Sequence, residues 1–205
     1  MTDRTDLNRR LALAELILPV LGAGFLPAPA RAATPPSSTL VAYLTRSGNT
    51  RVVAETLARR QGADLFEIRT ATPYPEDYDA HVELARQQRD AGIAPPLAST
   101  VPGFESYREI CLCFPIWGEA MPAPLRSFLT AHDAGTRRVL PFITHGGYGR
   151  GSSLETLAVL APQARIAPAF EQTCDAERDT IDLLTDWFAR TPGRRPSPRK
   201  KESYS

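Results

Sequence analysis

Three short segments of this 205-residue chain combine residue types that could bind a ligand or do chemistry. The first, residues 45–50, carries hydroxyl, glycine and asparagine side chains and opens directly into a helical pattern. Hydroxyls and free backbone N–H groups at a helix N-terminus bind anions, and a glycine lets the backbone turn closely around a phosphate. A plain turn with a helix cap is the alternative. We predict a phosphate-binding loop formed by Thr45, Arg46, Ser47, Gly48, Asn49 and Thr50.

The second segment follows a continuous apolar run and contains Trp117. A tryptophan in such a loop offers a flat apolar face on which a planar ligand can stack, or it anchors the loop on the domain. We include the whole loop in the predicted site: Pro115, Ile116, Trp117 and Gly118.

The third segment is rich in glycine, so its backbone amides can approach a planar ring closely. Tyr148 could supply a second aromatic face, and His145 is either a proton donor or a hydrogen-bonding support of the loop. The predicted site residues here are Thr144, His145, Gly146, Gly147, Tyr148 and Gly149.

Several kinds of site are not supported by the sequence. The first loop matches neither the GxGxxG nor the GxxxxGK[ST] pattern, so a dinucleotide or nucleoside-triphosphate site is not expected. The three cysteines form no CxxC pair and no Cys/His ligand spacing, so no metal site is expected. Cys111 and Cys113 stand two residues apart in an apolar run, and a strand would place both on one buried face.

The elements that must position these loops alternate along the chain. In an open α/β sheet, ligands bind beyond the carboxyl ends of the strands, where all three loops would lie. The pattern therefore predicts an α/β fold with a doubly wound, five-stranded parallel sheet and helices on both faces. The expected strands are residues 39–44, 63–68, 110–114, 139–144 and 165–170, and the expected helices are 50–60, 77–91, 123–131, 152–160 and 175–190.

The first residues have the pattern of a signal peptide. Arg9 and Arg10 precede a mostly apolar stretch at residues 11–26 that is too short to span a bilayer comfortably. Ala-Arg-Ala at residues 30–32 offers small side chains for cleavage. Paired arginines before a weakly apolar core indicate a twin-arginine signal. An ordinary secretory signal and an uncleaved anchor are the alternatives.

The whole chain is expected to divide into a signal peptide at 1–32, a linker at 33–38, a domain at 39–190 and a disordered basic tail at 191–205. Residues 1–32 hold four basic and three acidic groups, and residues 191–205 hold five and one. Removing both ends from the totals of 24 and 23 leaves residues 33–190 with 15 basic and 19 acidic groups, a net charge of −4. Such a domain is not expected to bind nucleic acid.

The chain resembles the flavodoxin family in its phosphate loop at 45–50, a Pro-Tyr-Pro-x-x-Tyr segment at 73–78, a Pro-Ile-Trp loop and a Thr-His-Gly-Gly loop. The resemblance implies the strand order 2-1-3-4-5 and one non-covalently bound FMN. It places the FMN phosphate on the first loop and the isoalloxazine ring between the other two. The chain departs from the family pattern at Gly118, where many relatives have an aromatic residue, and in its export signal.

The expected function is that of an FMN redox protein, either an electron carrier or a small flavin-dependent reductase, in which the flavin supplies the chemistry. The alternative is a non-redox protein that binds flavin or another phosphorylated ligand. We expect a periplasmic location, and a redox partner protein or a quinone-type small molecule as partner. Contact with a membrane is expected only during export.

Overall fold

The structure is a computed structural model that describes residues 37–173, 184 and 186–190. The expected signal peptide, most of the expected linker, the basic tail and much of the last expected helix lie outside the described residues. Within the described ranges, no helix has both the length and the apolar character needed to cross a membrane.

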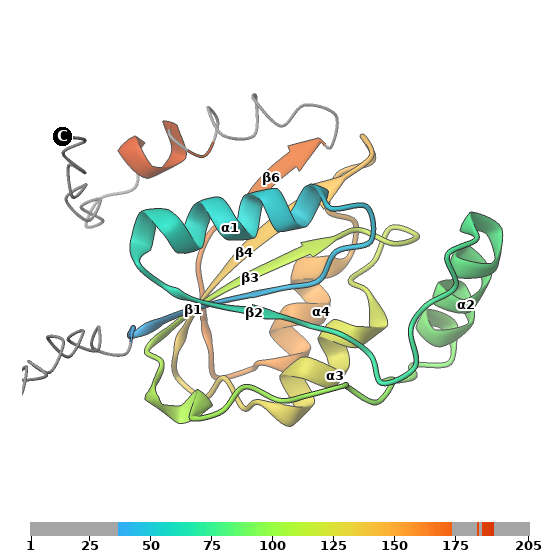
Figure 1. Ribbon diagram of the computed structural model, residues 1–205, viewed down its shortest axis with the longest axis horizontal. Helices are drawn as coiled ribbons and strands as arrows, with labels where there is room; N and C mark the ends of the chain where they lie inside the picture. The colour runs from blue at the N-terminus through green and yellow to red at the C-terminus, as the bar shows by residue number, and fades with distance from the viewer. Residues whose placement is uncertain (1–36, 174–183, 185, 191–205) are drawn as a thin grey trace, which may run out of the picture. The chain divides into compact units, whose positions relative to one another are not determined.

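A single parallel sheet carries the fold, and its strands run in the order β2-β1-β3-β4-β5, with β6 also paired to β4 (Figure 1). This order confirms the 2-1-3-4-5 topology. All five pairings are parallel, so the carboxyl ends of the strands meet at one edge of the sheet. The strands are β1 (Thr39–Tyr43), β2 (Asp64–Glu67), β3 (Glu109–Pro115), β4 (Arg138–His145), β5 (Arg165–Ile166) and β6 (Phe170–Thr173).

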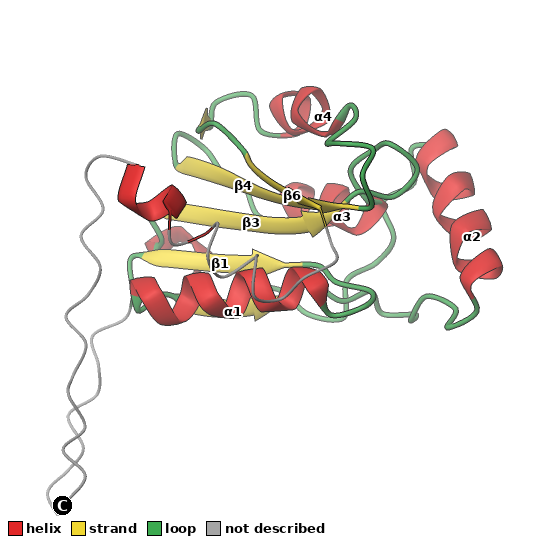
Figure 2. Cartoon of the chain, turned by 90° about the horizontal axis from the view of Figure 1, so that it is seen from above, coloured by secondary structure: helices red, strands yellow, loops and turns green. Residues whose placement is uncertain are grey.

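Helices cover both faces of the sheet. In Figures 1 and 2, α1 lies on one face, and α3 and α4 lie on the other. The remaining helix, α2, covers neither face and stands beyond the carboxyl ends of the strands. The helices are α1 (Asn49–Gln61), α2 (Tyr78–Asp90), α3 (Ala123–Ala131) and α4 (Ser153–Leu160), with a 3-10 turn η1 (Phe104–Ser106) before β3.

Two apolar layers hold this arrangement together, because alternate side chains of each strand point to opposite faces. In β1, Leu40 packs in the layer under α3 and α4, and Val41 packs in the layer under α1. Cys111 and Cys113 are both fully buried in the α1 layer, as predicted for small apolar side chains. Burial raises the pKa of the Cys111 thiol to about 12, so this sulfur stays protonated and unreactive.

The fifth expected strand, residues 165–170, differs from the prediction. It is broken into β5 and β6, and β6 extends three residues further. The N–H of Ala167 donates to the carbonyl of Val139, and the next bond of this register would use the N–H of residue 141. Pro141 has no N–H, and Pro168 occupies the gap on the other strand, so the ladder is interrupted there.

Candidate functional site

The loop before α1 leaves the N-terminus of this helix without a side-chain cap. Gly48 is its N-cap, with φ +98°, and its N–H donates to the hydroxyl oxygen of Thr45 at 3.0 Å. No side chain caps the helix, and its first turn contains no acidic residue. The first N–H groups of an α-helix have no partner within the helix. The N-terminus of α1 therefore presents backbone donors and the positive end of the helix dipole to the loop.

A buried hydrogen bond joins this loop to the third predicted loop. The hydroxyls of Thr50 and Thr144 lie 2.8 Å apart, and only 1 % of Thr50 and 2 % of Thr144 are exposed. Thr144 is in β4 and Thr50 is in α1, so the contact fixes the helix N-terminus against the carboxyl end of the central strands.

The loop after β3 forms a tight two-residue turn. Trp117 and Ala120 exchange two backbone hydrogen bonds of 3.1 and 3.3 Å across Gly118 and Glu119. Both central residues have positive φ, +58° for Gly118 and +61° for Glu119, which is the conformation of a type I′ turn. Glu119 is the only non-glycine residue with positive φ in the described part of the chain.

Two neighbouring elements hold this turn in place. The Glu119 carbonyl accepts the N–H of Ser152 at 3.1 Å, and a side chain at Gly151 would overlap that carbonyl. From the other side, Nη1 of Arg89 on α2 donates to the Gly118 carbonyl at 3.0 Å. The turn is therefore positioned jointly by α2 and the segment before α4.

Trp117 packs against two rings from the segment at residues 73–81. Its ring centroid lies 4.4 Å from His81 and 5.0 Å from Tyr74, both edge to face. Trp117 is half-buried, and one of its roles is therefore to anchor its loop, the alternative considered from sequence. It also lines both of the cavities described next.

Cavity A, of about 560 Å³, lies between the three predicted loops and α2. It brings together twelve of the sixteen predicted site residues from segments far apart in the chain. These are Arg46, Ser47, Asn49, Thr50, Pro115, Ile116, Trp117, Gly118, Thr144, His145, Gly146 and Tyr148.

The other four predicted residues do not line cavity A. Thr45 and Gly48 shape the start of α1, as described above. Gly147 donates its N–H to Nδ1 of His145 at 3.2 Å, so the histidine supports its loop by hydrogen bonding. Gly149 has φ +74° and contributes a bend.

Sequence reasoning missed the wall of cavity A that α2 provides. Its residues recur at helical spacing, a signal present in the sequence, but the polar character of the helix gave no reason to place that face on a ligand site. They are Tyr78, His81, Val82, Ala85, Arg86 and Arg89; Glu119 was also missed.

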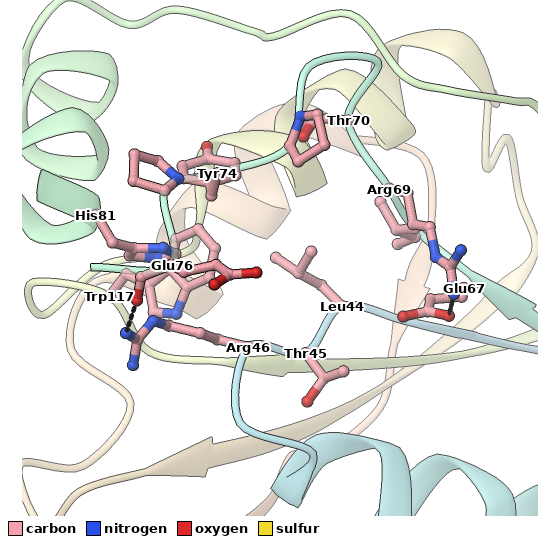
Figure 3. A pocket seen from close by; sticks show the side chains of 13 residues that line it. Leu44, Thr45, Arg46, Glu67, Arg69, Thr70, Tyr74, Glu76, His81 and Trp117 are labelled. Atoms are coloured by element: carbon pink, nitrogen blue, oxygen red, sulfur yellow. Dashed lines mark hydrogen bonds and ion pairs between the residues drawn. The ribbon is translucent and has the colours of Figure 1, made fainter. Parts of the chain in front are cut away.

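A second cavity, B, of about 500 Å³, lies at the carboxyl ends of β1 and β2, under the segment 73–76 (Figure 3). It shares three lining residues with cavity A: Arg46, His81 and Trp117. These three side chains border both cavities. No sequence pattern pointed to cavity B.

The side chains that border both cavities have an unusual arrangement of charge. The Arg46 guanidinium donates to the Glu76 carbonyl at 3.2 Å and lies 5.1 Å from the Tyr78 ring centre, and no described carboxylate forms an ion pair with it. Burial, and then the charge of Arg46, lower the pKa of His81, so this imidazole is neutral near pH 7. The Pro75 carbonyl has a weaker opposing effect, but its geometry is not that of a hydrogen bond.

The family model for flavodoxin matches residues 38–191, which span the sheet, the three loops and both cavities. This chain belongs to the flavodoxin family. No curated relative matches it. Solved structures share the fold of this flavodoxin. A protein from Bacteroides eggerthii named as a flavoprotein is 25 % identical, with a TM-score of 0.63 over 75 % of this chain and 98 % of its own.

A second similar structure is a flavoprotein from Lactobacillus acidophilus in complex with FMN. It is 19 % identical, with a TM-score of 0.58 over 70 % of this chain and 97 % of its own. At this identity the likeness concerns the fold. The strand order is therefore that expected of a flavodoxin.

Proposed function

We propose that this flavodoxin binds FMN in cavity A and works as a redox protein, either an electron carrier or a small flavin-dependent reductase. The observation that carries the proposal is that the uncapped N-terminus of α1 and the loops after β3 and β4 all meet at one cavity of about 560 Å³. The family and the FMN complex of the Lactobacillus acidophilus flavoprotein support the choice of cofactor.

The residues present fit the phosphate of FMN. An added Cβ at Gly48 would meet nothing within 4 Å, so the space beside the N-cap is open to a ligand. The free N–H groups of α1 would hold the phosphate, together with Ser47, Asn49 and Thr50, which line the cavity. Arg46 would add a cation at the same loop.

The other loops fit a planar ring. Trp117 and the turn after it would contact one side, and the loop from Thr144 to Tyr148 would contact the other. Tyr148 is 85 % exposed and lines the cavity, so it is available to cover a ring. Bound FMN would supply the electron-transfer chemistry, and the protein sets the orientation and solvent access of the ring.

The proposed partner is a redox protein or a quinone-type small molecule, because NAD(P)H is not expected outside the cytoplasm. A periplasmic location would follow from the signal-peptide pattern at residues 1–32 and belongs to the proposal.

Spectroscopy of the purified protein tests this function. We expect a flavin absorption spectrum that bleaches with dithionite and returns in air. After removal of the cofactor, FMN should rebind much more tightly than riboflavin, because riboflavin lacks the phosphate. Bound FMN that does not cycle would favour a non-redox flavin-binding protein. A colourless protein that ignores added FMN would contradict the assignment of cavity A.

A further inference from the structure

Gly118 has no side chain, and the guanidinium of Arg89 fills the space that one would occupy. A Cβ added at Gly118 would overlap Nη1 of Arg89 and would lie 3.5 Å from its Cζ. The same Nη1 donates to the Gly118 carbonyl at 3.0 Å. A charged group from α2 therefore takes the place of a side chain in the turn after β3.

This contact lies at the cavity that would hold the cofactor. Gly118 and Arg89 both line cavity A. The helix that carries Arg89 covers neither face of the sheet and stands beyond the carboxyl ends of the strands (Figure 2). Its hydrogen bond to the turn thus brings a cation to the loop that would contact the flavin ring.

Cavity A is basic, although the domain around it is acidic. Residues 33–190 carry a net charge of −4. Among the residues that the structure describes, the Arg, Lys, Asp and Glu side chains that line the cavity are those of Arg46, Arg86, Arg89 and Glu119, a net charge of +2. A net positive lining favours a bound group that gains negative charge.

The three arginines have different partners. Arg46 belongs to the phosphate loop. Arg86 is held by Glu83 of its own helix through two hydrogen bonds of 2.8 and 3.0 Å. Nε of Arg89 pairs with Asp90 at 2.9 Å, but Asp90 does not line cavity A, and Nη1 reaches the turn after β3. Arg89 is therefore the cation that is held at the loop for the ring.

We propose that the Arg89 guanidinium lies beside the flavin ring of bound FMN and raises its reduction potential. A guanidinium is planar and packs well against aromatic rings. Uptake of two electrons and one proton gives the flavin one further negative charge, which a neighbouring cation stabilises. The electrons come from the redox partner of the proposed function, on which this inference rests.

The test is a reductive titration of the FMN-loaded protein with dithionite, in the presence of a dye of known potential, together with the Kd for oxidised FMN. Arg89→Gln should lower the affinity for fully reduced FMN relative to oxidised FMN at least tenfold. This equals a fall in potential of about 30 mV for a two-electron couple. The affinity for oxidised FMN should stay within threefold of that of the parent protein.

Arg59→Gln is the matched control for the loss of one positive charge. Arg59 lies in the last turn of α1 and lines neither cavity. Like Arg89, it forms an ion pair on its own helix, with Glu55 at 3.4 Å. Arg59→Gln should leave the potential unchanged. Arg89→Lys keeps the charge, so its potential should lie between those of the parent and Arg89→Gln.

A second variant tests the inference in the opposite direction, even if Arg89→Gln does not fold. Asp90 is exposed, and Asp90→Asn removes the carboxylate that pairs with Arg89. The potential of this variant should rise above that of the parent, because the guanidinium is then no longer neutralised. A potential that is unchanged or lower overturns the inference.

The inference is also overturned if Arg89→Gln has the potential of the parent, or if it weakens oxidised and reduced FMN equally. Equal shifts in Arg89→Lys and Arg89→Gln would overturn it too, because the geometry of the turn and not the charge would then set the potential. In these cases the parent protein still binds FMN and cycles, so the proposed function stands. A parent protein that binds no FMN contradicts both proposals.

Discussion

Gly48 is the residue where the phosphate-loop hypothesis can be tested most directly. Its φ of +98° already disfavours a side chain, and the open space beside its Cα is where the structure would admit a phosphate. We predict that Gly48→Val raises the Kd for FMN at least ~100-fold, which is about 2.8 kcal/mol. The measurement is a titration of FMN fluorescence.

Gly62 provides a matched control at the other end of the same helix. It also has left-handed φ, +61°, and nothing lies within 4 Å of an added Cβ. Both substitutions should therefore destabilise the domain comparably, by roughly 1–2 kcal/mol. Only the Gly48 variant should lose FMN. Equal FMN affinity in the two variants would refute the phosphate loop.

His132 makes the stability of the protein sensitive to acid. The N–H of Val101 donates to its Nε2 at 2.8 Å, and its Nδ1 lies 2.9 Å from the Phe128 carbonyl, so the ring is a neutral Nδ1–H tautomer. Burial lowers the pKa of His132, and the Phe128 carbonyl partly offsets this effect. The pKa of His81 is lowered as well. A proton on Nε2 would remove the acceptor for Val101.

Proton linkage gives the direction in which stability changes with pH. Below the unfolded histidine pKa of about 6.5, the unfolded chain binds protons that the folded protein excludes. We predict that stability is at its full value above about pH 6.5 and falls as the pH drops toward 5.5. Urea unfolding across this range measures the effect. His132→Gln should make the slope smaller, and a flat profile in the parent protein would contradict the prediction.

At the scale of elements, the turn after β3 stores backbone strain at Glu119. A left-handed conformation costs a non-glycine residue roughly 1–2 kcal/mol, and glycine avoids this while losing about 0.5–1 kcal/mol of chain entropy. We predict that Glu119→Gly stabilises the domain by about 0.5–1 kcal/mol in urea unfolding. Glu119→Ala removes the carboxylate but keeps the strain, so it should not stabilise. If both variants are more stable than the parent protein, loss of the Glu119 charge and not relief of backbone strain explains the stabilisation.

Elements with a strong local pattern could be predicted from the sequence. The apolar run at 110–114 lies within β3, and the helix expected at residues 123–131 has the bounds of α3, because Pro122 precedes it and an apolar face defines it. The fifth strand was predicted less well. Its break depends on Pro141, a residue of the neighbouring strand, and local patterns carry no information about such pairing.

The candidate site shows the same limit. Its three loops could be predicted, because each follows a strand and the carboxyl ends of parallel strands meet at one edge. The position of α2 could not, since this helix covers no face of the sheet and depends on contacts such as Arg89 with the Gly118 carbonyl. Cavity B and the buried His81 follow from that position and were missed with it.

At the scale of the whole molecule, charge is distributed unevenly along the chain. Residues 33–190 carry −4, whereas the paired arginines at positions 9 and 10 stand before a weakly apolar segment. These arginines lie outside the described residues, so the proposal of export rests on the sequence pattern alone. A twin-arginine route would suit a protein that folds around FMN before export.

The final prediction concerns this route. We expect that replacing Arg9 and Arg10 together with lysine prevents the mature protein from reaching the periplasm. The twin-arginine route discriminates against paired lysines, whereas the ordinary secretory route accepts them because it needs only positive charge before an apolar segment. Cell fractionation followed by immunoblotting measures the outcome, and a known secretory protein in the same cells provides the control. If the double variant is exported and processed like the parent, the segment is an ordinary secretory signal, and FMN would then have to be acquired after transport.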